Sequence, residues 1–152
     1  SNAFITQWSV IMDKYGEGLL TKLREMSPRH YQSGVPSTNA LAAGEGIIQF
    51  PSVAAQVQAT KDRGAPIAHF IPSYTSGVEM HVVLTHRAKA KHPAAARLFA
   101  NFVMTLEGNK IFNSEPGSFS VFDTSNLPKD YVSPKVDALA RKDQIARLLG
   151  FQ

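Results

Sequence analysis

The stretch KHPAAARLFANFVMTLEGNKIF, from Lys91 to Phe112, is the segment that decides how the fold of this chain is interpreted. Pro93 suits the first turn of a helix, because the N–H that proline lacks would have no partner there. Apolar side chains then recur at helical spacing along one face, and Gly108 interrupts the pattern. The pattern predicts a helix that begins at Pro93, and a short helix that continues to Phe112.

Strand-like sequence precedes this region. GVEMHVVLTH, at Gly77–His86, alternates apolar and polar side chains, which is the period of a strand. The compact apolar runs GIIQF (46–50) and PIAHFI (66–71) predict two further strands. Between these runs, the sequence from Pro51 to Arg63 predicts a helix, with Pro51 at its first position.

The rest of the chain is predicted to be helical or irregular. Periodicity and breakers predict helices at 4–15, 17–26, 41–43 and 134–149, and an irregular segment at 113–133. Helices that alternate with strands are typical of an α/β fold, here a small mixed sheet flanked by helices. We expect one domain, residues 4–152, because Ser1-Asn2-Ala3 looks like the scar left by tag removal.

Composition excludes several classes of function. The chain has 152 residues, of which 43% are hydrophobic, so it can bury a core. Its 16 basic and 12 acidic residues give a formal charge of +4 and no dense basic patch, so no nucleic-acid partner is expected. It has no cysteine, which excludes disulfides and thiolate chemistry. No apolar run reaches the length of a membrane span.

The sequence contains no recognised catalytic or metal-binding motif. No nucleophile elbow, P-loop or dinucleotide fingerprint occurs. The histidines show no zinc-like spacing, and His81 and His86 fall on opposite faces of the strand predicted there. We therefore expect no catalytic activity, no cofactor and no metal site.

Four segments, taken in order, resemble a known family. They are SGVPSTNALAAGEGIIQF (33–50), KDRGAPIAHFIPSYTSGVEMHVVLTH (61–86), the stretch from Lys91 to Phe112, and KDQIARLLGFQ (142–152). Together they resemble the C-terminal half of a type 2 periplasmic solute-binding protein of an ABC importer, in the group of ferric-ion and phosphonate binders. The resemblance covers nearly the whole chain.

The resemblance implies a protein that captures a small solute between two lobes and delivers it to a membrane permease. This chain would supply the second lobe and the C-terminal helices, and the first lobe would precede Phe4. The implied location is the periplasm. A strand at Gly77–His86 without its usual sheet would have an unpaired edge, and such edges invite pairing with another chain. We therefore expect a homodimer in which this strand, or the helix after it, packs on a neighbour.

Two segments are candidate ligand contacts. Ser37, Thr38 and Asn39 can each cap a helix, and a helix start offers free N–H groups to an anion, although ordinary capping explains them too. The second segment is Gln49–Val53, at the end of the predicted strand 46–50, because ligands in open α/β sheets gather at the carboxyl ends of strands. Ser52 can donate a hydrogen bond there and Phe50 can pack on the ligand, or both can be structural.

The resemblance bears on the kind of ligand. The ferric-ion binders of the family carry adjacent tyrosines at the second segment, where this chain has Phe50, Pro51 and Ser52. An organic anion, such as a phosphonate, is therefore a better expectation than iron. Tyr74 lies in the polar turn SYTSG and is a further candidate near the hinge, although a surface role is the simpler interpretation.

One alternative function remains open, and the absence of cysteine counts against a second. The same architecture serves as the effector-binding domain of some bacterial transcription regulators, and upstream sequence would distinguish a signal peptide from a DNA-binding helix pair. An enzyme of this fold, such as a lyase of the porphyrin pathway, would need a cysteine-bound cofactor, and this chain has no cysteine.

Overall fold

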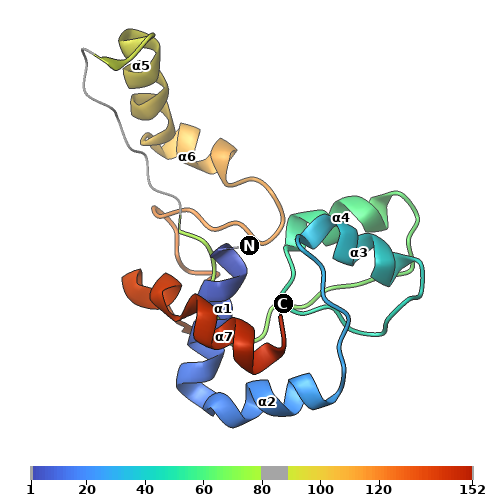
Figure 1. Cartoon of the computed structure of the whole chain (residues 1–152). Coiled ribbons are helices and arrows are strands. Elements are labelled where there is room, and N and C mark those ends of the chain that lie inside the picture. The colour runs from blue at the N-terminus through green and yellow to red at the C-terminus, as the bar shows by residue number, and fades with distance from the viewer. Residues whose placement is uncertain (1, 80–88, 152) are drawn as a thin grey trace. The chain divides into compact units, whose positions relative to one another are not determined.

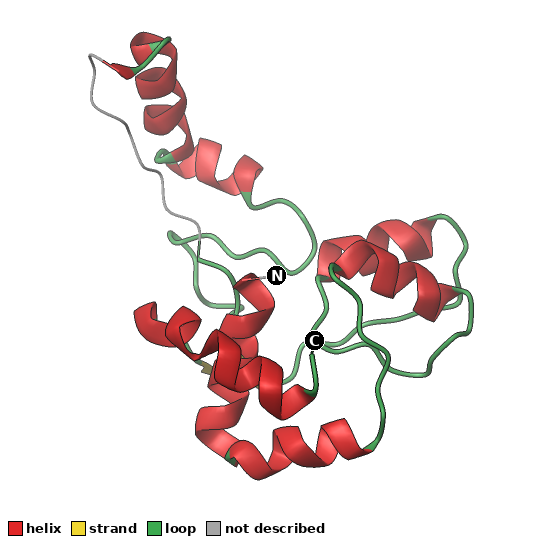
Figure 2. Ribbon diagram, in the orientation of Figure 1, coloured by secondary structure: helices red, strands yellow, loops and turns green. Residues whose placement is uncertain are grey.

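The structure of the chain is a computed structural model that describes residues 2–79 and 89–151. Helices dominate the described residues, as Figures 1 and 2 show. The contacts divide the chain into two units, of which the first comprises residues 1–79 and 128–152 and the second residues 80–127. Each unit has its own packing.

The core of the first unit lies between its N-terminal and C-terminal helices. Helix α1 (Asn2–Tyr15) and helix α2 (Glu17–Glu25) are separated by Gly16, and both pack against α7 (Lys142–Leu149), as Figure 1 shows. The 3₁₀ helix η2 (Val136–Arg141) leads directly into α7. Apolar residues at helical spacing on each helix meet in one cluster, which contains Ile5, Trp8, Met12, Leu20, Ile145 and Leu149.

A second helix pair belongs to the same unit. Helix α3 (Gly34–Ala42) packs against α4 (Ala54–Asp62). Thr38 of α3 and Val57 and Thr60 of α4 are buried in this pair. Each buried threonine hydroxyl bonds to the backbone carbonyl four residues earlier, a bond that satisfies the hydroxyl inside a helix. The pair therefore buries polar as well as apolar groups.

The sheet of the described residues is small. Strand β1 (Tyr74–Thr75) pairs in parallel with β2 (Asp130–Tyr131), and Tyr74 lies opposite Asp130. The Asp130 N–H donates to the Ser73 carbonyl at 3.0 Å, and the Val132 N–H donates to the Thr75 carbonyl at 2.9 Å. This ladder brings together two segments that are far apart in sequence.

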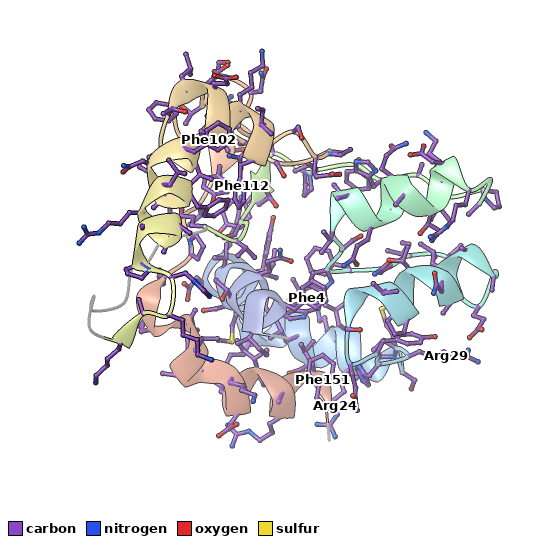
Figure 3. The ribbon with its side chains drawn as sticks, turned by 90° about the horizontal axis from the view of Figure 1, so that it is seen from above. Phe4, Arg24, Arg29, Phe102, Phe112 and Phe151 are labelled. Carbon is purple, nitrogen blue, oxygen red and sulfur yellow. The ribbon has the colours of Figure 1, made fainter. Side chains whose placement is uncertain are left out.

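The described part of the second unit is built on a helical corner. Helix α5 (Pro93–Val103) packs against α6 (Leu106–Phe112), and Figure 3 labels one phenylalanine of each helix, Phe102 and Phe112. Thr105 caps α6, because its hydroxyl accepts a hydrogen bond from the Gly108 N–H at 3.1 Å. The corner thus brings the end of α5 close to the first turn of α6.

The predicted helices are largely confirmed. Helices end at Tyr15 and begin at Glu17 and Pro93 as the sequence predicts, and α7 ends at Leu149. Gly108 was expected to interrupt the helix, but it lies inside α6, and the chain bends earlier, at residues 104–105. The glycine is required because a Cβ here would clash with the Phe102 carbonyl of the preceding helix, and it does not mark a helix end.

The predicted strands at 46–50 and 66–71 are wrong for this structure. Neither segment is a strand, and the side chains of Ile47 and Ile48 are 96% and 86% exposed. A strand needs a neighbour to pair its backbone groups, and no such neighbour lies beside these segments among the described residues. Of the strand expected at Gly77–His86, residues 80–86 lie outside the described residues, and residues 77–79 are irregular.

Two helix starts also differ from the prediction. Helix α4 begins at Ala54, so Pro51 precedes it and is not its first residue. Helix α3 begins at Gly34, seven residues before the predicted start. Pro36 does not prevent this, because it lies in the first turn of the helix, where a backbone N–H would have no partner. The fold class is confirmed only coarsely: the described residues form a helix-rich chain with a small parallel sheet, where a mixed sheet was expected.

Candidate functional site

The two segments that the sequence singled out are joined by a hydrogen bond. The Thr38 hydroxyl on α3 donates to the side-chain carbonyl Oε1 of Gln49 at 3.0 Å, and it also lies 2.9 Å from the Gly34 carbonyl oxygen. The Gln49 amide Nε2 donates to that same carbonyl at 3.4 Å. Thr38 is 1% exposed, so the contact is shielded from water. The structure thus brings the first candidate segment beside the second.

Two buried side-chain oxygens, one just after Gln49 in sequence and one on α4, have unused hydrogen-bonding capacity. Ser52 Oγ and Gln56 Oε1 are both buried, and neither has a hydrogen-bond partner within the described part of the chain. Gln56 also lies close to α3, because a Cβ added at Gly34 would be 2.5 Å from Gln56 Oε1. We call Gly34, Thr38, Gln49 and Gln56, together with Ser52 from the stretch that follows Gln49 in sequence, the polar cluster, which contains no charged side chain.

The position of Ser37, Thr38 and Asn39 corrects one premise of the sequence analysis. They were expected at a helix start, but α3 begins at Gly34 and they lie inside it. Ser33 is the N-cap residue, and its side chain makes no capping hydrogen bond. Of the three, Thr38 enters the polar cluster and Asn39 is exposed. The free N–H groups at this end of the helix therefore come from residues before Ser37.

Phe50 contacts the core helix α1 and is not part of the polar cluster. Its ring meets the Trp8 ring edge to face, with centroids 4.9 Å apart, while 52% of the residue remains exposed. Such an arrangement stabilises an aromatic pair and leaves part of the ring available to other contacts. Phe50 thus connects the segment before α4 to the core of the first unit.

Tyr74 is held by α1. Its hydroxyl donates to the Val10 carbonyl at 3.1 Å, and the Lys14 ammonium nitrogen lies 3.7 Å from the centre of its ring. The Tyr15 ring lies edge to face with it, 6.2 Å away between centroids. The hydroxyl of Tyr74 therefore already has a partner, and these contacts explain why β1 lies against α1. None of the contacts joins Tyr74 to the polar cluster.

An ion-pair cluster ties α1 to the segment before α7. The Asp13 carboxylate lies 2.7 Å from the Lys135 ammonium and 2.6 Å from the Arg141 guanidinium, and Arg141 also donates to the Ser9 hydroxyl at 2.9 Å. The hydrogen bond from Lys135 to the Asp13 carboxylate, and next in effect the one from Arg141, lower the pKa of Asp13 below its ordinary value. One carboxylate is bonded to two cations here, and these bonds join α1 to the segment before α7, so the cluster is structural.

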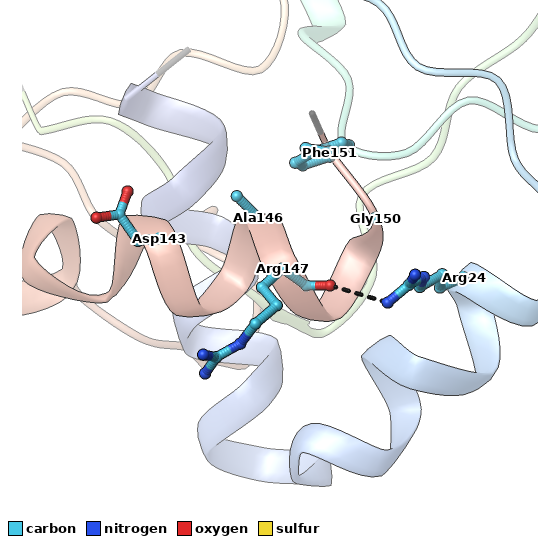
Figure 4. Close-up of a pocket in the computed structure, with 6 residues that line it drawn as sticks. All are labelled: Arg24, Asp143, Ala146, Arg147, Gly150 and Phe151. Carbon is cyan, nitrogen blue, oxygen red and sulfur yellow. Dashed lines mark hydrogen bonds between the residues drawn. The ribbon is translucent and has the colours of Figure 1, made fainter.

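Sequence reasoning did not find a groove at the end of α7 (Figure 4). It has a volume of about 370 Å³ and is lined by Arg24, Asp143, Ala146, Arg147, Gly150 and Phe151. The Arg24 guanidinium donates to the Arg147 carbonyl at 3.3 Å, so it completes the bonding of the helix end. The basic residues in the last turns of α2 and α7 were visible in the sequence, but nothing there indicated that the two ends meet.

The described residues contain neither a metal-binding cluster nor a helix that could span a membrane. In the described ranges, no three acidic, histidine or cysteine side chains gather closely enough to hold a metal ion. No helix among these residues is both long and apolar enough to cross a bilayer. Comparison of the chain with protein-family models, curated proteins and solved structures gave no match.

Proposed function

We propose that this chain forms the second lobe and C-terminal helices of a type 2 periplasmic solute-binding protein, which captures a small solute for an ABC importer. The observation that carries the proposal is the 3.0 Å contact between Thr38 and Gln49. The helix start expected at 37–39 and the strand expected at 46–50 are both wrong, but the two candidate segments are joined by this hydrogen bond. In this proposal the polar cluster forms part of the floor of the solute-binding cleft.

The chemistry of the polar cluster suits a small polar or anionic solute. The Ser52 hydroxyl can donate a hydrogen bond, and the Gln56 side-chain oxygen can accept one. No carboxylate belongs to the cluster, so an anion would meet no repulsion from its members. Glu45, at the far end of the α3 segment, is neutralised by Arg29 at 2.7 Å. The solute would reach the hydroxyl and amide groups after a modest side-chain rearrangement.

Binding would act by closing two lobes around the solute. Ligand contacts that form only in the closed state favour that state over the open one. Phe50 follows Gln49 in the sequence and is about half exposed to solvent. Its ring would pack on the apolar part of the solute. A lobe by itself supplies part of the contacts, so we expect dissociation constants in the millimolar range for the 152-residue chain.

The test is a ligand screen followed by mapping. Thermal-shift assays of the chain with phosphonates, carboxylates, thiamine, polyamines and ferric salts should show that one class raises the melting temperature. A ¹H–¹⁵N NMR titration with that probe, at concentrations up to the millimolar range, should then shift the amide signals of residues 37–39 and 49–52. Signals that shift only around Arg24 and Arg147 would place binding in the groove of Figure 4 and contradict the proposal.

A matched pair of variants sharpens the test. Thr38→Val removes the hydroxyl from the polar cluster and should weaken binding by roughly 2- to 12-fold, the effect of one lost hydrogen bond. Thr21→Val removes an exposed hydroxyl whose one bond among the described residues is to the Glu17 carbonyl, and it should leave affinity unchanged. The proposal fails if no class of solute binds, or if the two variants bind alike.

A further inference from the structure

The second unit presents an exposed apolar stripe, formed by Leu98, Phe99, Phe102 and Phe112. Phe102 follows Leu98 by four residues and Phe99 by three, and these spacings place the three side chains on one side of α5. Phe112 of α6 continues the stripe, because its ring lies 6.5 Å from that of Phe99. Of the buried residues of α5, Ala100 lies away from the stripe, and Val103, one turn after Phe99, lies at its edge.

The stripe is large for a surface without a partner. Its members are 73%, 56%, 43% and 45% exposed in chain order. At roughly 200 Å² for a large side chain, these fractions correspond to about 430 Å² of exposed apolar surface. A patch of this size is within the range of roughly 300–600 Å² that often marks an interaction site on a monomer.

We propose that this stripe is the interface between two copies of the chain in solution. Interfaces are about 60% apolar, so an apolar centre of this size implies about 700 Å² of buried surface on each copy. Two copies would then bury about 1,400 Å² in total, within the range of specific interfaces. A second copy supplies an identical stripe, and a two-fold pairing matches each apolar residue with another.

The charges around the stripe do not oppose self-association. Its members are uncharged, and the flanking charged residues of the two helices carry both signs: Arg97, Glu107 and Lys110. Because both signs are present, two copies do not present faces of uniform like charge to each other. None of these three side chains forms an ion pair in the part of the chain that the structure describes.

The experiment is sedimentation equilibrium of the chain at several concentrations, with Leu98→Glu as the test variant. Wild type should be in a monomer–dimer equilibrium, and Leu98→Glu should raise the dissociation constant by about 100-fold, because a two-fold interface contains the residue twice. Met26→Glu changes a residue that is equally exposed, at 77%, but lies in the first unit, and it should leave the equilibrium unchanged. A monomeric wild type at 200 μM or more, or a dimer that only Met26→Glu disrupts, would overturn the proposal.

Hydrogen exchange of the unmodified chain gives a second readout, so the test does not depend on the variant folding. Amides of residues 93–112 should become more protected as the protein concentration rises. Protection that is independent of concentration would mean that another part of the same chain covers the stripe, and the proposal would then be wrong. The inference is independent of the solute-binding function, since a failed ligand screen leaves the self-association result unaffected.

Discussion

Replacing Gly108 by alanine tests why a glycine occupies the first turn of α6. A Cβ at this position would lie 1.9 Å from the Phe102 carbonyl oxygen and 2.6 Å from its carbonyl carbon. Those atoms belong to the backbone of α5, so they cannot rotate away as a flexible side chain could. Ordinary contact needs about 3.4 Å, and the corner between the helices must therefore open by more than 1 Å.

The cost follows from the bonds that hold this corner closed. The Thr105 N–H donates to the Phe102 carbonyl at 3.0 Å, and the buried Asn109 amide donates to the Val103 carbonyl at 3.2 Å. Overpacking costs about 1–3 kcal/mol, and losing these two bonds adds about 1 kcal/mol each. Alanine recovers about 1 kcal/mol of helix propensity. The net destabilisation of the corner is therefore about 2–4 kcal/mol.

The assay is hydrogen exchange by mass spectrometry on peptides that cover residues 93–113. The loss of stability should accelerate exchange there by roughly 30-fold to several hundred-fold. Gly18→Ala is the matched control, because it makes the same change inside helix α2, where the described residues beyond its chain neighbours and the adjacent helix backbone leave the new Cβ open space to 4 Å. It should stabilise α2 by about 0.5–1 kcal/mol. Equal effects of the two substitutions, or slower exchange in Gly108→Ala, would refute the reasoning.

Two further predictions concern contacts of α1. Asp13→Asn should destabilise the chain at pH 7, and the difference should shrink as the pH falls below about 4. The pKa of Asp13 is lowered on folding, so its contribution is fully present above the unfolded-state pKa and is lost as the pH falls through the lower, folded-state value. Denaturant titrations of both proteins across this range measure the difference, and a gap that stays constant with pH would contradict it. Tyr74→Phe should cost about 1 kcal/mol by removing the bond to Val10, and it should lower the melting temperature by about 2–4 °C. Tyr31→Phe removes a hydroxyl that makes no bond in the described ranges and should have no effect; a Tyr74→Phe variant as stable as that control would show that the bond contributes nothing.

Helices could be predicted because their information is local. The boundary between α1 and α2 at Gly16, the start of α5 at Pro93 and the end of α7 before Gly150 all follow from residues within one turn. Capping, proline geometry and left-handed glycine act over that short distance. The apolar faces through which these helices pack could also be predicted, from the spacing of apolar residues in the sequence.

Strands could not be predicted in the same way, because a strand depends on a distant partner. The runs at 46–50 and 66–71 have the composition of strands, but they remain unpaired in this structure. Tyr74 and Thr75 lie in a turn-like sequence, yet they pair with Asp130 and Tyr131 from an irregular segment. Pattern and propensity indicated where strands were possible and could not show which segments would meet.

The candidate site shows the same division. Thr38 and Ser52 were identified from the sequence alone, as hydroxyl groups at an expected helix start and an expected strand end. The sequence could not show that Thr38 would bond to Gln49, or that Gln56 would approach Gly34, because those contacts depend on how α3 packs against α4. Residue chemistry and helical periodicity were determined by the sequence, since both are properties of neighbouring residues. Tertiary structure decided which polar groups are buried together, because burial depends on packing between segments distant in the chain.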